Sequence, residues 1–315
     1  MYKKAAILGI GGTKLSNDER TLIRNKKPWG IILFSRNIKD IKQLKNLIDS
    51  IKYCAQDKKY PIIIDQEGGK VSRLNKIVDL SIFSQKYFGQ LYIKDKNNFE
   101  NYYKIYINNV CKILNEVGIN INTVPVLDVI RTNTHNIIGD RSFSSNAKVV
   151  SQLGQLCIKL YEKNKIATVI KHIPGHGLSK VDTHLDLPII YNKKKELIKN
   201  DFKPFKQCKS LFAMTAHIIY SDYDSKFAAT QSKIIINKII RKHISFKGIL
   251  ISDDISMKSL KYGLVDNSRK ALDAGCNLIL HCNGNIKEMF KLLEIVPTID
   301  KFTQKKTSDF YKFLG

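Results

Sequence analysis

The sequence has no hydrophobic run that could cross a bilayer, since none of its apolar stretches approaches the roughly 20 residues that a membrane-spanning helix needs. It also lacks the features of a signal peptide, because the apolar stretch 5–8 is too short and no small-residue cleavage site follows it. Both absences argue against export and against a membrane partner. We therefore expect a protein of the cytoplasm.

Cysteine pairs of the C-x-x-C type are absent, although the chain contains six cysteines. Most of them stand in apolar or helical surroundings, which is typical of reduced structural thiols rather than of disulfides or zinc ligands. These cysteines are Cys54, Cys111, Cys157, Cys208, Cys276 and Cys282. The cysteine pattern therefore predicts neither a disulfide framework nor a structural metal site.

Acidic residues are scarce, with 28 Asp and Glu against 53 Lys and Arg, which gives a formal net charge of +25. Such a charge can mark a nucleic-acid-binding protein, but an arginine-rich arm, a basic motif interleaved with aromatics and zinc-finger spacing are all missing. The lysines are spread along the chain together with many Ile and Asn, which indicates compositional drift in an AT-rich genome. We expect no specific nucleic-acid partner.

What the sequence does contain is a regular alternation of short apolar runs with longer amphipathic stretches. This alternation is typical of strand–helix units and a parallel sheet. Apolar runs occur at 5–10, 30–34, 61–64, 121–126, 167–170, 210–216, 248–251 and 277–280. Helical periodicity covers 41–54, 98–117, 147–163, 193–208, 231–242, 268–274 and 286–293.

Eight strand–helix units in a chain of 315 residues predict a single α/β domain, a (β/α)8 TIM-type barrel over residues 1–315. Residues 297–315 are expected to form a C-terminal extension packed on the barrel. A doubly wound sheet is the alternative, but it would gather fewer of the polar groups described next into one place.

Polar side chains follow the apolar core of six predicted strands, namely Asp65, Asp128, Lys171, His217, Asp253 and His281. In a (β/α)8 barrel the carboxyl ends of the strands meet at one rim, where the active site lies. We therefore expect these groups to converge there.

The loop after the fifth predicted strand concentrates titratable groups, because His172, His176 and His184 fall within thirteen positions and Asp182 joins them. A solvated surface loop is one interpretation, and a metal site is another. Metal ligation through the i, i+4 pair His172 and His176 needs a helix, which Pro174 between them disfavours. The third interpretation takes Asp182 as the orienting partner of His184, which would then serve as a general acid/base.

Two adjacent carboxylates, Asp253 and Asp254, end the seventh predicted strand. Because successive strand residues point to opposite faces, only one of them readily points into the barrel mouth, and alternation alone does not say which. A carboxylate at that position, opposite an imidazole on a loop, suits double-displacement glycoside chemistry. Helix capping or an ion pair is the structural alternative.

Taken together, these segments resemble bacterial β-N-acetylglucosaminidases of glycoside hydrolase family 3, the cytoplasmic β-hexosaminidases of peptidoglycan recycling. The resemblance covers about residues 5–295. It is carried by KHIPGHG at 171–177, DTH at 182–184 and SDDISM at 252–257, and further by ILFSRN at 32–37, DQEGG at 65–69, PVLDV at 125–129, GDRSF at 139–143 and AGC at 274–276.

The resemblance implies a role for each matching residue. Asp253 corresponds to the catalytic nucleophile, His184 to the general acid/base and Asp182 to its orienting partner. Thr183 stands where serine is common and keeps the hydroxyl. The residues implied to bind the N-acetylglucosamine in the −1 subsite are Asp65, Arg73, Arg141, Lys171 and His172.

The family resemblance implies a retaining exo-β-N-acetylglucosaminidase that works through a covalent glycosyl-aspartate intermediate without metal or cofactor. The expected substrate is N-acetylglucosaminyl-1,6-anhydro-N-acetylmuramic acid, with or without its peptide, and the expected state is a monomer. Three alternatives remain: a family 3 glycosidase or phosphorylase acting on another β-glycoside, a metal-dependent barrel hydrolase, and a non-enzymatic basic binding protein.

Overall fold

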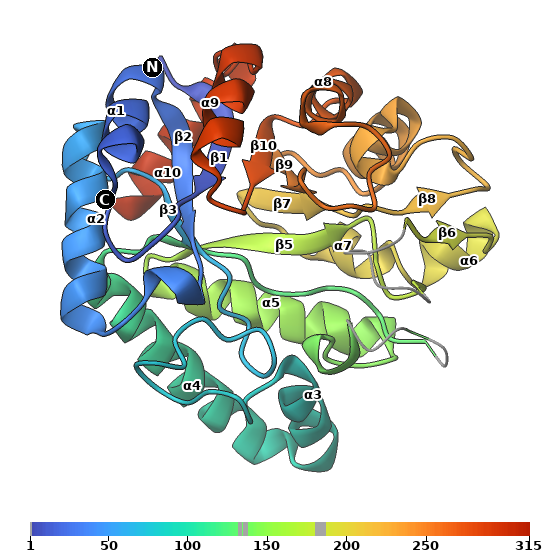
Figure 1. Cartoon of the computed structure of the whole chain (residues 1–315). Coiled ribbons are helices and arrows are strands. Elements are labelled where there is room, and N and C mark those ends of the chain that lie inside the picture. Colours follow the sequence, from blue (N-terminus) through green and yellow to red (C-terminus); the bar gives the residue numbers. More distant parts are fainter. Residues whose placement is uncertain (1, 132–133, 135–137, 180–186) are drawn as a thin grey trace.

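The computed structural model of the chain describes residues 2–131, 134, 138–179 and 187–315. Within them, eight parallel strands close into a barrel, which confirms the predicted (β/α)8 fold (Figure 1). Around the barrel the order is β1-β10-β9-β7-β5-β4-β3-β2. The strands are β1 (Lys4–Gly9), β2 (Pro28–Leu33), β3 (Ile62–Ile64), β4 (Ile121–Asn122), β5 (Ala167–Ile173), β7 (Phe212–Thr215), β9 (Ile249–Asp254) and β10 (Leu278–His281).

Each barrel strand lies on one of the eight predicted apolar runs. Two further strands, β6 (Ile189–Ile190) and β8 (Ile219–Tyr220), pair in parallel outside the barrel and were not expected. They are two residues long each, which is too short for a recognisable sequence period.

Helices cover the outside of the barrel (Figure 1). They are α1 (Asn17–Lys26), α2 (Ile41–Ala55), α3 (Gln85–Lys94), α4 (Lys96–Val117), α5 (Ala147–Lys163), α6 (Lys194–Lys199), α7 (Lys203–Gln207), α8 (Leu264–Ala274), α9 (Ile286–Ile295) and α10 (Lys301–Leu314), together with the π-helix η4 (Ile235–His243) and the short 3₁₀ turns η1 (Ser35–Asn37), η2 (Gly139–Arg141) and η3 (Ala229–Gln231). No helix within the described part of the chain combines the length and the hydrophobicity that crossing a bilayer requires.

The prediction of one helix over 193–208 is wrong, because the chain forms two short helices there. Pro204 lies in the first turn of α7, the place where a helix tolerates proline. Asp201, between the two helices, is buried and pairs with Arg131 at 2.8 Å. The proline and this ion pair together account for the break.

Helix α1 was not predicted, although its start carries a readable signal. Ser16 Oγ accepts from the Glu19 amide at 3.1 Å, and Glu19 Oε2 accepts from the Ser16 amide at 2.8 Å. This reciprocal capping box satisfies two amides that would otherwise lack partners at the helix start. The S-x-x-E spacing at 16–19 would have predicted the start of this helix.

Apolar side chains fill the interior of the barrel, and α10 covers the amino-terminal ends of its strands. The inner cluster includes Ile7, Ile63, Ile121, Val169, Ile249, Ile251 and Leu280. At the amino-terminal end, Phe310 of α10 is fully buried, with its ring centroid 5.5 Å from that of Phe212. Trp29 donates its Nε1–H to Thr307 of the same helix at 2.9 Å. Side chains of α10 therefore close the amino-terminal end of the barrel, and the polar groups lie at the carboxyl-terminal end.

Candidate active site

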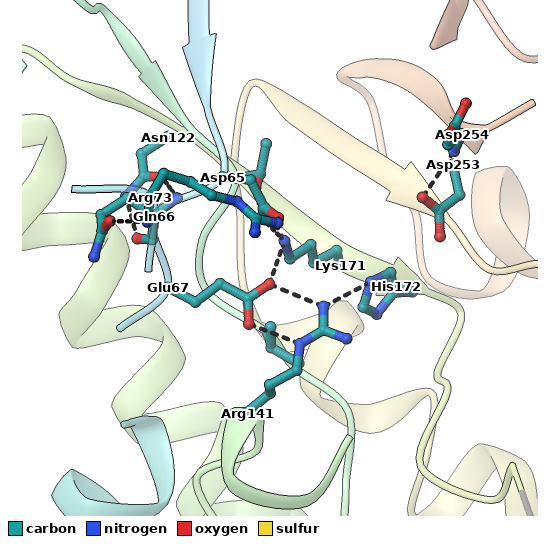
Figure 2. Close-up of polar contacts among 12 residues, drawn as sticks. Asp65, Gln66, Glu67, Arg73, Asn122, Arg141, Lys171, His172, Asp253 and Asp254 are labelled. Atoms are coloured by element: carbon teal, nitrogen blue, oxygen red, sulfur yellow. Dashed lines mark hydrogen bonds and ion pairs between the residues drawn. The ribbon is translucent and has the colours of Figure 1, made fainter. Parts of the chain in front are cut away.

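The barrel opens at the carboxyl ends of its strands into a cavity of about 170 Å³. Six residues that the sequence analysis assigns to substrate or catalysis line this cavity: Asp65, Arg73, Arg141, Lys171, His172 and Asp253. They come from four separate parts of the chain. Figure 2 shows Asp253 at the end of its strand and the other five grouped apart from it.

The pleat of the strands explains why these side chains face the cavity. Ile63 and Val169 belong to the inner cluster, and two residues further along their strands stand Asp65 and Lys171. Since side chains alternate with a period of two, the position two residues after an inward one also points inward. The rim of the barrel is thus the polar continuation of its apolar interior.

The same rule distinguishes the two adjacent carboxylates. Ile249 and Ile251 point inward, so Asp253 follows them into the cavity mouth. The carboxylate of Asp254 is occupied instead, because its Oδ1 accepts from the amides of Ser256 at 3.1 Å and Cys282 at 3.2 Å. Both carboxylates line the cavity, and Asp254 is the one with an oxygen engaged by two neighbouring amides.

Asp253 has one engaged oxygen and one open oxygen. Its Oδ1 accepts from the Asp254 amide at 2.8 Å, while Oδ2 has no hydrogen-bond partner among the described residues. Burial raises the pKa of Asp253, but its polar neighbours His217, His172, the Asp254 amide and Lys171 together outweigh burial and hold the pKa below its usual value. The carboxyl is therefore ionised at neutral pH, as a nucleophile must be.

Asp65 is the acceptor for three donors at the cavity wall. Its Oδ2 accepts from Arg73 at 2.6 Å, and its Oδ1 accepts from Thr123 Oγ1 at 2.6 Å and from the Lys171 ammonium. Burial raises the pKa of Asp65, but Lys171 and Arg73 outweigh it and hold the pKa well below its usual range. Asp65 is therefore ionised at neutral pH.

His172 is held in one orientation by Asp128, which the sequence analysis placed at the rim without a role. Its Nδ1 donates to Asp128 Oδ2 at 2.7 Å, and its Nε2 lies 3.3 Å from Arg141 Nη2. A guanidinium can only donate, so Nε2 accepts and the ring proton is on Nδ1. Asp128 Oδ1 also accepts from the amides of His172 at 3.2 Å and His176 at 2.6 Å, which ties the start of the following loop to the same carboxylate.

Asp182, Thr183 and His184 lie outside the described residues, so their roles remain predictions. The loop that leads to them begins tightly packed. At Gly177 a Cβ atom would overlap the backbone carbonyl of Val129, so only glycine fits there. His176 is buried at this start, and burial together with His172 lowers its pKa to about 4.

Three of the six expected rim residues do not line the cavity: Asp128, which bonds His172, and the histidines His217 and His281. His217 bonds Thr230 at 2.8 Å and the Asp254 carbonyl at 3.0 Å, and His281 bonds Glu288 at 2.8 Å. The alternation again explains the difference, because both follow an inward residue, Met214 or Leu280, by an odd number of positions. These two histidines therefore bond neighbouring residues rather than line the cavity.

Two residues that contact the Lys171 ammonium, Glu67 and Thr123, were not predicted from the sequence. Glu67 stands in the DQEGG segment, but a side chain in a glycine-rich turn has no periodicity from which its direction can be predicted. Thr123 could have been found, because it follows the inward Ile121 by two residues.

The histidine spacing considered as a metal site does not form one in the described part of the chain. His172 uses Nδ1 for Asp128 and turns Nε2 toward a guanidinium, whose charge opposes a neighbouring cation. The described residues contain no group of three or more His, Cys, Asp or Glu side chains arranged to hold a metal ion.

The chain is similar in sequence to known glycoside hydrolases. The family model described as "Glycosyl hydrolase family 3 N terminal domain" matches residues 2–309. A curated relative, the β-hexosaminidase of Haemophilus influenzae, is 34% identical over 285 residues, which are 88% of this chain and 79% of the relative.

The chain is also similar to solved structures of a bacterial enzyme. NagZ from Neisseria gonorrhoeae in complex with N-trifluoroacetyl-D-glucosamine superimposes with a TM-score of 0.87 at 28% identity, covering 100% of this chain and 90% of that one. A structure of the same NagZ in complex with zinc ion gives a TM-score of 0.87 at 28% identity, with 99% and 90% covered. The chain therefore belongs to glycosyl hydrolase family 3, as a glycoside hydrolase of the bacterial β-N-acetylhexosaminidase type.

Proposed function

We propose that this enzyme is a retaining exo-β-N-acetylglucosaminidase acting on peptidoglycan fragments, N-acetylglucosaminyl-1,6-anhydro-N-acetylmuramic acid with or without its peptide. The observation that carries the proposal is the ionised Asp253 carboxylate, with an open oxygen, across the cavity from a cluster of fixed donors and acceptors. The neighbouring NagZ structure in complex with an N-acylated glucosamine supports the choice of sugar.

The cluster suits a terminal sugar with several free hydroxyls. Asp65 supplies ionised acceptor oxygens, Arg73 and Arg141 supply charged donors, and Lys171 adds a positive charge to the cavity wall, so each hydroxyl can both donate and accept. The cavity lining also includes apolar side chains such as Met214, Met257 and Leu280, which suit the apolar face of a sugar.

In the proposed reaction an Asp253 oxygen attacks the anomeric carbon and forms a glycosyl ester, while the glycosidic oxygen leaves with a proton from His184. Water then gives a proton back to His184 and attacks the same carbon, which releases the sugar and regenerates the carboxylate. Two inversions give net retention. Asp182 is proposed to orient the His184 ring.

The first test measures p-nitrophenol release from its β-N-acetylglucosaminide and from its β-glucoside. We expect cleavage of the first alone, and cleavage of the glucoside at an equal rate would contradict the choice of sugar. A 5-fluoro N-acetylglucosaminyl fluoride should then label the peptide that contains Asp253. An α-configured first product by NMR would contradict the double displacement.

The phosphorylase alternative has a physical basis, because a neutral imidazole at the acid/base position would not repel an anionic acceptor as a carboxylate does. Adding inorganic phosphate to the assay decides this point. Formation of N-acetylglucosamine 1-phosphate would make phosphate an acceptor, and its absence would leave water.

The metal-dependent alternative is tested by the same assay with a strong chelator and with added zinc. We expect chelator-resistant activity, since Asp253 and His184 suffice for the proposed chemistry. Loss of activity with the chelator and recovery with zinc would favour the metal-dependent reaction. The zinc arm is informative because the neighbouring NagZ has been solved with zinc ion.

A cytoplasmic location and a monomeric state complete the proposal. Cell fractionation checks the first, and light scattering on the purified protein checks the second. A stable dimer or an exported enzyme would contradict the respective statement.

A further inference from the structure

A buried carboxylate that does not line the cavity lies directly behind two residues that do. Glu67 Oε2 accepts from Arg141 Nε at 2.8 Å, and Glu67 Oε1 accepts from Arg141 Nη2 at 2.9 Å and from the Lys171 ammonium (Figure 2). The side chain of Glu67 is 1% exposed, and that of Lys171 is 3% exposed. One carboxylate therefore joins two cavity cations in surroundings that exclude water.

The backbone fixes where Glu67 points. Its amide donates to the Val71 carbonyl at 2.9 Å, and the chain reverses through Gly68 and Gly69, whose φ angles are +89° and +60°. A Cβ at Gly68 would overlap the Phe83 carbonyl, so this turn tolerates only glycine. Rigid backbone on both sides limits how far the Glu67 side chain can follow a displaced partner.

The contacts of Lys171 show what Glu67 contributes. An ammonium has three N–H donors, and those of Lys171 meet Asp65 Oδ1, Thr123 Oγ1 and Glu67 Oε1. Asp65 and Thr123 lie on the cavity wall, whereas Glu67 lies behind it. Without the carboxylate, the buried Lys171 and the partly buried Arg141 would face each other with less compensating charge and would separate.

We propose that Glu67 is a positioning residue that fixes Lys171 and Arg141 as one unit against the sugar in the −1 subsite. The inference rests on the proposed function, because it assumes that these two cations contact the substrate. It acts through them and not on the reacting atoms, so it should govern sugar binding more than the chemical step.

The test is Glu67→Gln, which keeps the shape but replaces one acceptor oxygen with an NH₂ group. That group meets an N–H of Lys171 or Arg141, so one cation loses one of its hydrogen bonds and shifts. A lost hydrogen bond to a charged group corresponds to a change on the order of 10- to 150-fold. We expect KM for the aryl N-acetylglucosaminide and the inhibition constant of free N-acetylglucosamine to rise together by at least about 10-fold, with kcat falling less.

Glu19→Gln is the matched control, because Glu19 is also a buried glutamate but caps α1 and does not line the cavity. It should lower the unfolding temperature and leave KM unchanged. A purely structural role for Glu67 predicts the same pattern: a lower unfolding temperature, fewer sites labelled at Asp253 and an unchanged KM in the remaining active enzyme. That pattern in Glu67→Gln would overturn the inference.

Two further variants make the result decisive. In a Lys171→Met background, Glu67→Gln should cost less than it costs alone, since part of its effect passes through Lys171, and multiplicative losses would contradict this. If Glu67→Gln does not fold, Glu67→Asp keeps the charge but is too short to span both cations. Its KM should still rise, and a wild-type KM would overturn the inference.

The outcomes separate this inference from the proposed function. A wild-type protein that cleaves no N-acetylglucosaminide refutes the function before any variant is made. An active wild type with unchanged sugar binding in Glu67→Gln refutes only the role of Glu67.

Discussion

Replacing Asp128 by Asn should reverse the hydrogen bonding of His172 while changing a single atom. Asp128 Oδ1 accepts from two backbone amides, those of His172 and His176, so an Asn side chain keeps its oxygen there. Its NH₂ group then faces His172 Nδ1, which is 2.7 Å from the present Oδ2. The ring must accept at Nδ1 and carry its proton on Nε2.

The reversed ring opposes Arg141. An Nε2–H would point at Arg141 Nη2, 3.3 Å away, where two donors now meet and the hydrogen bond is lost. A hydrogen bond to a charged group contributes about 1.5–3 kcal/mol, and about 1.4 kcal/mol corresponds to a tenfold change. We therefore expect kcat/KM for the aryl N-acetylglucosaminide to fall by about 10- to 150-fold.

Asp57→Asn is the control for this variant. Asp57 is a carboxylate at the opposite end of the barrel, where it accepts from Lys3 at 2.9 Å and from Tyr311. This substitution should lower stability and leave the kinetic constants as they are. The reasoning is refuted if Asp128→Asn folds and keeps kcat/KM within about threefold of wild type, because a single hydrogen bond to a charged group is worth more.

The remaining predictions concern catalysis and stability. Asp253→Ala should lower turnover at least about 1,000-fold with an unchanged fold by circular dichroism, and substantial residual turnover would refute its role as nucleophile. His184→Ala should slow natural substrates more than aryl glycosides, because a good leaving group needs little protonation, and equal losses would count against the acid/base assignment. Phe310→Ala, which empties a fully buried site at the amino-terminal end of the barrel, should cost about 3–5 kcal/mol by denaturant unfolding, whereas Phe302→Ala on the same helix, 39% exposed, should cost far less; similar losses would mean that α10 does not close the barrel as described. The pKa of His176 is lowered to about 4 from 6.5, so between these pH values the unfolded chain binds a proton that the folded chain does not bind. The free energy of unfolding should therefore fall by up to about 3 kcal/mol as the pH drops from 6.5 to 4. A His176→Gln variant with the same pH dependence would show that another group is responsible.

Local patterns predicted the barrel because each strand–helix unit is a local event. Buried parallel strands are apolar runs, and the helices that cover them show a 3.6-residue period, as α2 does with Leu44, Leu47, Ile48 and Ile51. Prediction failed where a local rule was overlooked, as at the capping box of α1, or where a rule competes with another, as at Pro204. The two-residue strands β6 and β8 carry no periodic signal at all.

The roles of the site residues came from a different source than the fold. Alternation alone could not choose between Asp253 and Asp254; the resemblance to family 3 chose Asp253, and the inward direction of Ile249 and Ile251 agrees with that choice. The direction depends on which face of β9 meets the barrel interior, and that is decided when all the strands close. Asp182 and His184 still depend on the resemblance.

The sequence by itself determined the barrel strands, many of the helices and the clustering of polar residues at strand ends, because these follow from periodicities within a few residues. Only the tertiary structure decided which polar groups share a hydrogen bond. Glu67 and Arg141 are 74 positions apart, and Asp128 and His172 are 44 apart. No local pattern records such pairs, since they form only when closure of the barrel brings the carboxyl ends of distant strands to one rim and buries their charges together.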